Sequence, residues 1–189
     1  MSFHQSQEEI QQELAVIARA KTDPNRFSPL YEKYYKAIFL FVYRRVDDEE
    51  LSGDLTSQVF LKAILNLPRY EYKGVPFSAW LYRIASNEIN QHFRQNKTER
   101  TISIETEGLE RLLGELSETS REPDEKEQII IESMNLLNKE EVQYLELRFF
   151  EDKSFREIGY IMLVTENNAK VKTYRILDKI KKMLTGRKK

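Results

Sequence analysis

Hydrophobic residues recur at helical spacing through most of the chain before Lys97, and no segment alternates strictly between apolar and polar positions. This spacing predicts helices over residues 8–20, 27–46, 51–67 and 77–96. Pro24 separates the first of these helices from the second and Pro68 ends the third, because the residue before a proline disfavours the helical conformation and proline itself suits a helix start. Residues 69–76, with Gly74 and Pro76, are expected to form a loop. We therefore predict an all-α fold.

A second helical domain follows an interruption in this pattern. Residues 101–124 contain glycine, proline, serine and threonine among many acids, and we interpret them as a solvated acidic linker with at most one weak helix near 109–116. Apolar periodicity then returns, and two capping boxes, Asn138 with Glu141 and Ser154 with Glu157, indicate where later helices begin. We predict two small helical domains, 1–100 and 125–189, joined by the linker 101–124.

Composition excludes several classes of function. The chain has no Cys and two isolated His, so it holds no disulfide or thiolate metal site and no evident metal-binding pair. No apolar run approaches the roughly 20 residues of a membrane-spanning helix, and the N-terminus lacks the pattern of a signal peptide. We find no nucleophile triad, metal spacing or phosphate loop. We expect a cytoplasmic protein that is not an enzyme, needs no cofactor or metal and does not insert into a membrane.

Charge is distributed unevenly along the chain. The net charge of -1 conceals an acidic stretch over residues 101–128 and a strongly basic one from Glu166 to the end. A basic C-terminal segment predicts a polyanionic partner.

The region from Ser154 to Leu184 has the pattern of a helix-turn-helix. A short helix with Gly159, placed where a side chain would obstruct a neighbouring segment, is followed by a break at Leu163-Val164 and by a good N-cap, Thr165. The next helix has one apolar face, while the other can meet base edges and phosphates. The residues proposed to contact DNA are Thr165, Asn167, Asn168, Lys170, Val171, Tyr174 and Arg175. The alternative interpretation is an amphipathic hairpin with a solvated basic face.

A second candidate surface lies on the helix predicted over 77–96. One face is apolar, and the other carries amide and basic groups without an acid. Four aromatic residues stand beside it: Tyr70, Tyr72, Phe77 and Trp80. Aromatic rings next to amides and Arg can stack on unpaired bases, each base contributing about 1–3 kcal/mol. The alternative is that Phe77 and Trp80 belong to the core.

The helix predicted over 51–67 offers a third surface. Its main apolar stripe is broad, yet Leu61 and Leu65 fall on the opposite side, in line with Asp54 and Gln58. An exposed apolar pair bordered by polar groups indicates a partner-binding surface. Single exposed leucines are also common, so this pattern alone is weak.

Several sequence motifs, taken in order, resemble those of the sigma-70 family, specifically its minimal extracytoplasmic-function members with only regions 2 and 4. The motifs are FSPLYEKYYKAIF, DLTSQVFLKAILNL and FSAWLYRIASNEINQHFR in the first domain, and LLNKEEVQYLELRFFEDKSFREIG and NNAKVKTYRILDKIKKML in the second. The resemblance covers nearly the whole chain. It implies an RNA polymerase sigma factor in which residues 1–100 form region 2 and residues 125–189 form region 4.

The resemblance also implies partners and roles. Region 2 would bind the β′ clamp helices of core RNA polymerase and open the -10 promoter element. Region 4 would meet the β flap and place the helix after Thr165 in the major groove of the -35 element. Polymerase binding is assigned to Asp54, Gln58, Leu61, Lys62 and Leu65. Recognition of the -10 element, including a flipped-out base, is assigned to Tyr72, Lys73, Phe77, Arg83, Asn87, Gln91 and Arg94. Family members commonly have an anti-sigma factor, which we also expect.

The other function left open is a helix-turn-helix transcriptional regulator with an N-terminal sensing or dimerisation domain. Such a regulator would not need the nucleic-acid face and aromatic loop predicted on the helix over 77–96.

Overall fold

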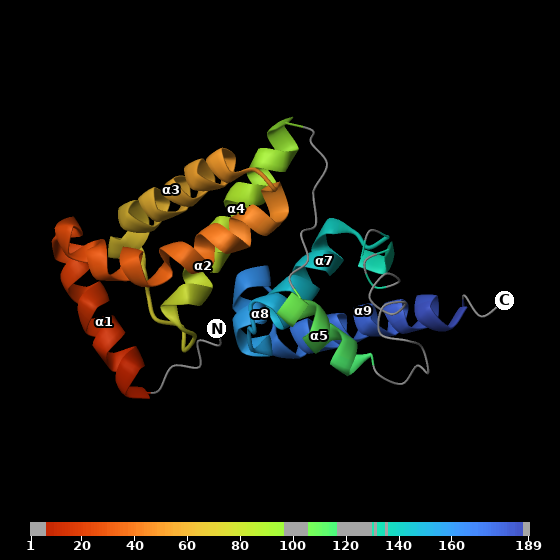
Figure 1. The fold of residues 1–189 in the computed structure, drawn as a ribbon. Coiled ribbons are helices and arrows are strands. Elements are labelled where there is room, and N and C mark those ends of the chain that lie inside the picture. Colours follow the sequence, from red (N-terminus) through yellow and green to blue (C-terminus); the bar gives the residue numbers. More distant parts are fainter. Residues whose placement is uncertain (1–6, 97–105, 117–129, 131, 135, 187–189) are drawn as a thin grey trace. The chain divides into compact units, whose positions relative to one another are not determined.

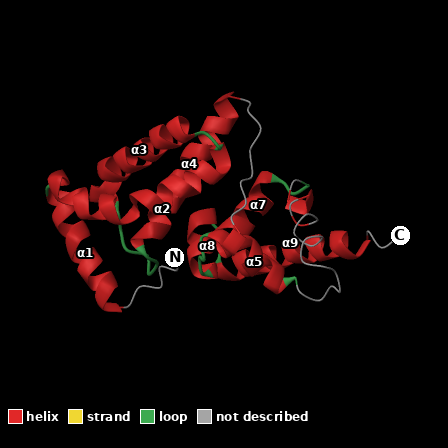
Figure 2. Cartoon of the chain, viewed as in Figure 1, coloured by secondary structure: helices red, strands yellow, loops and turns green. Residues whose placement is uncertain are grey.

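A computed structural model describes residues 7–96, 106–116, 130, 132–134 and 136–186, and within them the regular elements are all helical (Figures 1 and 2). The chain divides into two compact units, one over Phe3–Ser103 and one over Ile104–Lys189. The predicted all-α class is confirmed. Within the described residues, none of the helices combines the length and apolar character needed to cross a bilayer.

The first unit contains the four helices expected from the apolar spacing. Its elements are α1 (Gln7–Thr22), η1 (Pro24–Phe27), α2 (Ser28–Val46), α3 (Glu49–Asn66), η2 (Leu67–Arg69) and α4 (Phe77–Asn96). Asp48 caps α3, because its carboxylate accepts a hydrogen bond from the Leu51 amide at 2.8 Å. Short 3-10 turns containing Pro24 and Pro68 stand where the sequence predicts helix boundaries.

Helices α2, α3 and α4 pack against one another and enclose the core of this unit (Figure 1). Tyr34 and Ile38 from α2, Val59 and Ala63 from α3, and Leu81 and Ala85 from α4 are all almost fully buried. Residues four apart lie on the same side of a helix, so each helix contributes one apolar face to this core. The opposite faces of α3 and α4 therefore remain available for partners.

The second unit is built around a helix-turn-helix. Its elements are α5 (Thr106–Glu115), α7 (Lys139–Leu145), the π-helical segment η3 (Glu146–Phe150), α8 (Phe155–Met162) and α9 (Glu166–Gly186). Both predicted capping boxes are confirmed, at the start of α7 and of α8. The turn between α8 and α9 contains Leu163 with a positive φ of 58°, the left-handed conformation that frequently ends a helix.

The helix expected near 109–116 is present as α5, but it packs into the second unit and is not part of a solvated linker. Residues of α5 pack on η3, with Leu109, Leu112 and Leu116 buried. Gly108 lies so close to the Phe150 ring that a side chain there would clash with it. The apolar stripe at helical spacing was masked in the sequence by the surrounding acids. The rest of the predicted linker and of the acidic stretch, together with the last three basic residues, lies outside the described residues.

Candidate nucleic-acid interface

Helix α9 presents the outward face that the sequence predicted. All seven proposed contact residues are exposed, from Thr165 to Arg175. The opposite face is buried through Ala169, Thr173, Ile176, Leu177 and Ile180. Thr165 caps the helix, since its hydroxyl accepts a hydrogen bond from the Asn168 amide at 3.2 Å. The helix therefore projects amide, apolar and cationic groups together, as a helix in a DNA groove must.

Close backbone packing fixes the start of α9 against α8. A Cβ atom on Gly159 would lie 2.8 Å from the Val164 carbonyl oxygen and 3.1 Å from the Glu166 nitrogen. Both atoms belong to backbone and cannot move aside easily, so glycine is required for this turn. The expectation that another segment passes closely at Gly159 is confirmed.

Two lysines of α9 are engaged within the unit instead of serving the outward face. Lys172 Nζ lies 2.6 Å from Glu140 Oε1, and Lys179 Nζ lies 2.9 Å from Glu141 Oε2. The hydrogen bond with Glu140 raises the pKa of Lys172 above its ordinary value, because it stabilises the ammonium form. These contacts hold α9 to α7 and distinguish Lys172 from the exposed Lys170.

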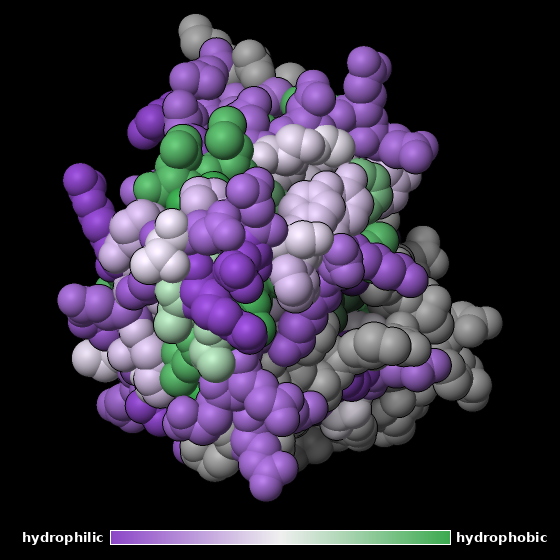
Figure 3. Space-filling view, turned by 90° about the vertical axis from the view of Figure 1, so that its left-hand side faces the viewer, coloured by the Kyte–Doolittle hydropathy of each residue, from purple (hydrophilic) through white to green (hydrophobic). Residues whose placement is uncertain are grey.

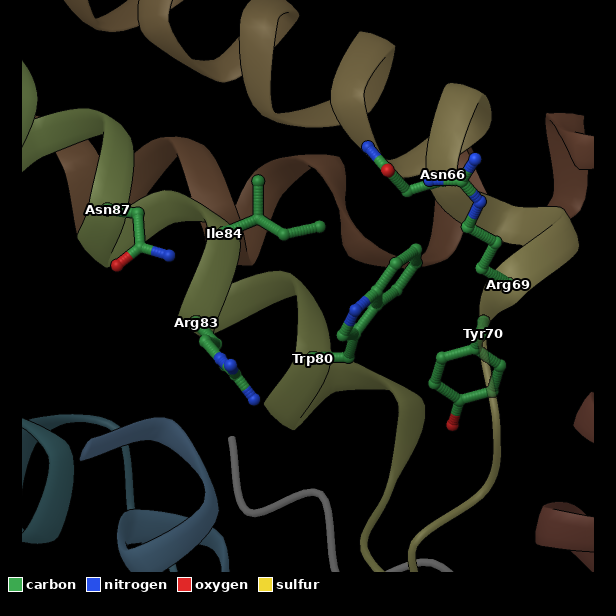
Figure 4. A pocket seen from close by; sticks show the side chains of 7 residues that line it. All are labelled: Asn66, Arg69, Tyr70, Trp80, Arg83, Ile84 and Asn87. Atoms are coloured by element: carbon green, nitrogen blue, oxygen red, sulfur yellow. The ribbon is translucent and has the colours of Figure 1, made fainter. Parts of the chain in front are cut away.

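The first unit carries a hollow between the end of α3 and the polar face of α4, with a volume of about 330 Å³. Its lining residues are Asn66, Arg69, Tyr70, Trp80, Arg83, Ile84 and Asn87. In Figure 4, Asn66 and Arg69 come from the end of α3 and from η2, while Trp80, Arg83, Ile84 and Asn87 project from α4. The hollow thus joins two guanidinium groups, two amides and an indole ring.

The indole ring is held by other aromatic residues. The centroid of Trp80 lies 4.9 Å from that of Tyr70 and 5.3 Å from that of Phe77. Such tilted ring contacts are favourable and fix ring orientation. A flat heteroaromatic group could stack on Trp80 while the amides reach its edge and the guanidinium groups meet a phosphate. This chemistry suits an unpaired nucleotide.

Six of the seven predicted -10 contacts fall into three groups. Arg83 and Asn87 line the hollow, and Gln91 and Arg94 continue the exposed face of α4. Tyr72 and Lys73 are exposed on the preceding loop, where Lys73 pairs with Glu71 at 2.5 Å.

Phe77 requires a correction. Its side chain is 1% exposed and lies among the rings of Phe27, Tyr34 and Tyr70. Such a residue cannot stack on a base in this conformation, so Phe77 is part of the core that supports Trp80. Tyr70, expected in the aromatic platform, is also buried. Aromatic residues at the ends of a loop are equally suited to core and surface, so the sequence could not tell the buried ones from the exposed ones.

The sequence alone did not indicate Asn66 and Arg69 as site residues. Asn66 is the last residue of α3 and Arg69 the last of η2, and the packing of α3 on α4 brings them beside Trp80. The available sequence signal was a polar and a basic residue flanking Leu67-Pro68, directly before the aromatic loop.

The third predicted surface, on α3, has the expected apolar pair. Leu61 is 56% exposed and Leu65 68% exposed, and Asp54 and Gln58 are exposed on the same helix. Figure 3 shows that hydrophobic groups on one side of the molecule gather in a few small areas among hydrophilic ones. Leu61 and Leu65 are four residues apart and therefore neighbours on α3, which makes them a candidate partner-binding surface.

Lys62, assigned to the same surface, is engaged with α4. Its Nζ lies 2.6 Å from both carboxylate oxygens of Glu88, a residue that is 6% exposed. A buried carboxylate needs such a partner, because desolvation penalises its charged form. Lys62 therefore ties α3 to α4 through a buried carboxylate.

Comparisons with known proteins agree with these features. The family described as Sigma-70 region 2 matches residues 30–99. The sigma factor BldN of Streptomyces coelicolor is 26% identical over 181 residues, which cover 90% of this chain and 65% of BldN, slightly under two thirds of its length. SigM of Bacillus subtilis, also an extracytoplasmic-function (ECF) RNA polymerase sigma factor, is 24% identical over 152 residues, covering 80% of this chain and 91% of SigM.

A solved structure shares the fold. The sigma factor RpoE, in complex with the anti-sigma factor NepR from Bartonella quintana, aligns with a TM-score of 0.58 and 15% sequence identity. The alignment covers 86% of this chain and 98% of RpoE.

Proposed function

Because the chain belongs to the sigma-70 family, in its extracytoplasmic-function group, we propose that it binds core RNA polymerase and directs initiation at specific promoters. The observation that carries this proposal is that one chain has two different surfaces whose chemistry suits nucleic acid. One is the exposed face of α9, and the other is the hollow beside Trp80. A promoter must be both located as duplex and opened, which requires two such surfaces.

The face of α9 suits duplex DNA. Asn167 and Asn168 can pair with base edges in the major groove, while Lys170 and Arg175 can meet phosphates. Thr165, Val171 and Tyr174 complete this face. We assign it to the -35 element and residues 125–189 to region 4.

The hollow beside Trp80 suits an unpaired base of the -10 element. Opening a duplex costs stacking energy, and a protein can offset that cost by capturing an extruded base. Trp80 offers the stacking surface, Asn66 and Asn87 offer amides, and Arg69 and Arg83 offer positive charge for the backbone. Exposed Tyr72, Lys73, Gln91 and Arg94 would extend this contact along the strand. Residues 1–100 would then act as region 2.

The apolar pair on α3 suits the β′ clamp helices of the polymerase, with Asp54 and Gln58 as flanking polar contacts. Lys62 would contribute mainly by holding α3 to α4. We also propose that the second unit meets the β flap and that an anti-sigma factor holds the protein inactive, as NepR forms a complex with RpoE. The protein would act in the cytoplasm and without catalysis of its own.

Reconstituted transcription tests the proposal. Core polymerase with this chain should initiate at promoters, selected from a randomised library, that core alone ignores. The double variant Lys170→Ala with Arg175→Ala should lose promoter binding. The double variant Arg83→Ala with Asn87→Ala should bind the promoter but open its -10 element slowly. Both double variants should retain binding to core polymerase. Replacement of the exposed Glu32 by Ala is the matched control. A chain that binds duplex DNA but neither binds core nor confers initiation is instead a transcriptional regulator.

A further inference from the structure

Two large side chains on the outward face of α9 are apolar or aromatic although the face as a whole is polar and cationic. Val171 is 38% exposed and Tyr174 is 45% exposed. They stand three residues apart, which makes them neighbours on a helix surface. Exposed Lys170 and Arg175 flank them in the sequence. The pair therefore forms a small apolar area inside a surface suited to a polyanion.

The Tyr174 ring is held in place by a chain of contacts from outside α9. Its centroid lies 6.0 Å from that of Phe155, the first residue of α8. The guanidinium carbon of Arg148 lies 4.8 Å from the Phe155 centroid, close enough for a cation-π contact. Arg148 Nη1 also donates a hydrogen bond to the Lys153 carbonyl oxygen at 3.0 Å. The ring of Tyr174 is thus oriented before any ligand binds.

The chemistry of the major groove identifies what an apolar area on such a helix can read. Of the four bases, thymine presents a methyl group there, and apolar side chains discriminate it by contact with that group. A pre-oriented ring loses little conformational freedom on binding, so more of the contact energy is available for discrimination. The cationic neighbours of the pair favour DNA over an apolar protein segment as its occupant.

We propose that Val171 and Tyr174 read thymine 5-methyl groups in the upstream duplex element, and that Phe155, braced by Arg148, is a positioning residue for Tyr174. The inference rests on the proposed function, since it specifies what the -35 contact recognises. It adds Phe155 and Arg148, which lie outside α9, to the residues that determine specificity.

Deoxyuridine substitution tests the methyl contact directly, because uracil differs from thymine by that methyl alone. Holoenzyme made from the full chain and core polymerase would first select its -35 element from a randomised library. Each thymine of that element, on both strands, is then replaced singly by uracil, and the affinity ratio is measured by equilibrium competition. We expect about a fourfold preference for thymine at two positions, from the burial of one methyl group at each.

Variants then assign the two positions. Val171→Ala should abolish the thymine preference at one of them, and Tyr174→Ser should abolish it at the other, whereas Tyr174→Phe should keep it. Phe155→Ala should weaken the preference at the Tyr174 position and leave the Val171 position unchanged. Leu163→Ala, which removes an exposed apolar side chain from the turn outside α9, should change neither ratio. Phe155→Met replaces the Ala variant if that variant loses its helical circular dichroism.

The contrary outcomes are distinct. A -35 element without A·T pairs, or one insensitive to uracil at every position, overturns the methyl contact while leaving the proposed function intact. Weakened core binding in Val171→Ala and Tyr174→Ser, with the uracil ratios unchanged, makes the pair a protein contact and also overturns it. An unchanged ratio in Phe155→Ala at the Tyr174 position removes the positioning role. Failure of the wild-type holoenzyme to select any promoter overturns the proposed function itself.

Discussion

The two surfaces of this chain proposed to bind nucleic acid are built in opposite ways. The hollow beside Trp80 is concave and draws its lining from α3, η2, the following residue and α4. The face of α9 is one side of a single helix, and its proposed contacts are all exposed. An unpaired base can be enclosed from several sides, whereas a base pair in duplex DNA is reached by a helix that projects into the groove. Shape thus separates the two tasks.

The surfaces also differ in what supports them. Trp80 is positioned by aromatic rings that reach it from Tyr70 and Phe77. Helix α9 is positioned by a tight backbone approach at Gly159 and by two lysine–glutamate pairs. A change in the first unit should therefore affect strand opening, and a change in the second should affect duplex binding.

The largest expected effect concerns the turn before α9. Gly159→Ala places a Cβ atom 2.8 Å from a backbone oxygen and should lower the free energy of unfolding of the second unit by about 2 kcal/mol. Gly114→Ala in the same unit is the matched control, since nothing lies within 4 Å of its Cβ position. Helix propensity should make that control slightly more stable, by about 0.5–1 kcal/mol. Urea unfolding followed by circular dichroism measures both.

Equal effects of the two glycine substitutions would mean that the α8–α9 turn can relax around a side chain. The close backbone approach at Gly159 would then not be what holds α9 in position.

Trp80→Ala should have the next largest effect, and it should change the opening of the promoter duplex without changing its binding. Loss of one stacking surface removes about 1–3 kcal/mol, or roughly 5- to 150-fold in the equilibrium for opening the promoter duplex. Permanganate reactivity of promoter thymines measures opening, and a template already mismatched across the -10 element should restore transcription. Trp80→Phe keeps a ring and should retain most of the activity. Loss of closed-complex binding in Trp80→Ala would show that the two surfaces are not separate.

The sequence predicted the outward face of α9 correctly and the hollow incompletely, for a physical reason. Periodicity within one helix identifies its own buried and exposed sides, so Lys170, Val171 and Arg175 could be placed without tertiary information. The hollow depends on which elements meet, so Asn66 and Arg69 were missed and Phe77 was assigned to the surface although it is buried. Burial of an aromatic residue at a helix start is decided by its neighbours in space.

The same limit explains α5 and Lys62. The leucines of α5 have helical spacing, but their burial requires η3 as a partner, which local pattern does not reveal. Lys62 lies on α3 among residues assigned to the polymerase, and its pairing with Glu88 joins residues 26 apart. Contacts between elements are what the sequence left undetermined.

A double-mutant cycle on Lys62 and Glu88 should give a smaller effect, because Lys62 is partly exposed and water screens the pair. We expect a coupling of about 1 kcal/mol between Lys62→Met and Glu88→Gln in the unfolding free energy of the first unit. The control cycle, Lys62→Met with Gln91→Ala, should show none. If there is no coupling, Lys62 is better assigned to polymerase binding. Its replacement should then weaken core binding without changing the free energy of unfolding.

The smallest expected effect compares two lysines of α9 that differ in their partners. Lys170 is exposed, whereas Lys172 is hydrogen-bonded to Glu140 at 2.6 Å. Each phosphate contact contributes about 0.9 to the slope of log affinity against log salt concentration on duplex DNA, because it releases condensed counterions. Lys170→Ala should therefore lower the slope for promoter binding by about 1, and Lys172→Ala should leave it nearly unchanged. Titration of holoenzyme binding between about 50 and 200 mM salt measures both slopes. Arg94→Ala on α4 should alter the slope on a template mismatched across the -10 element and not on closed duplex. If the slope falls by about 1 in both lysine variants, Lys172 must leave Glu140 when DNA binds. Helix α9 would then present a different charged face from the one in the free protein.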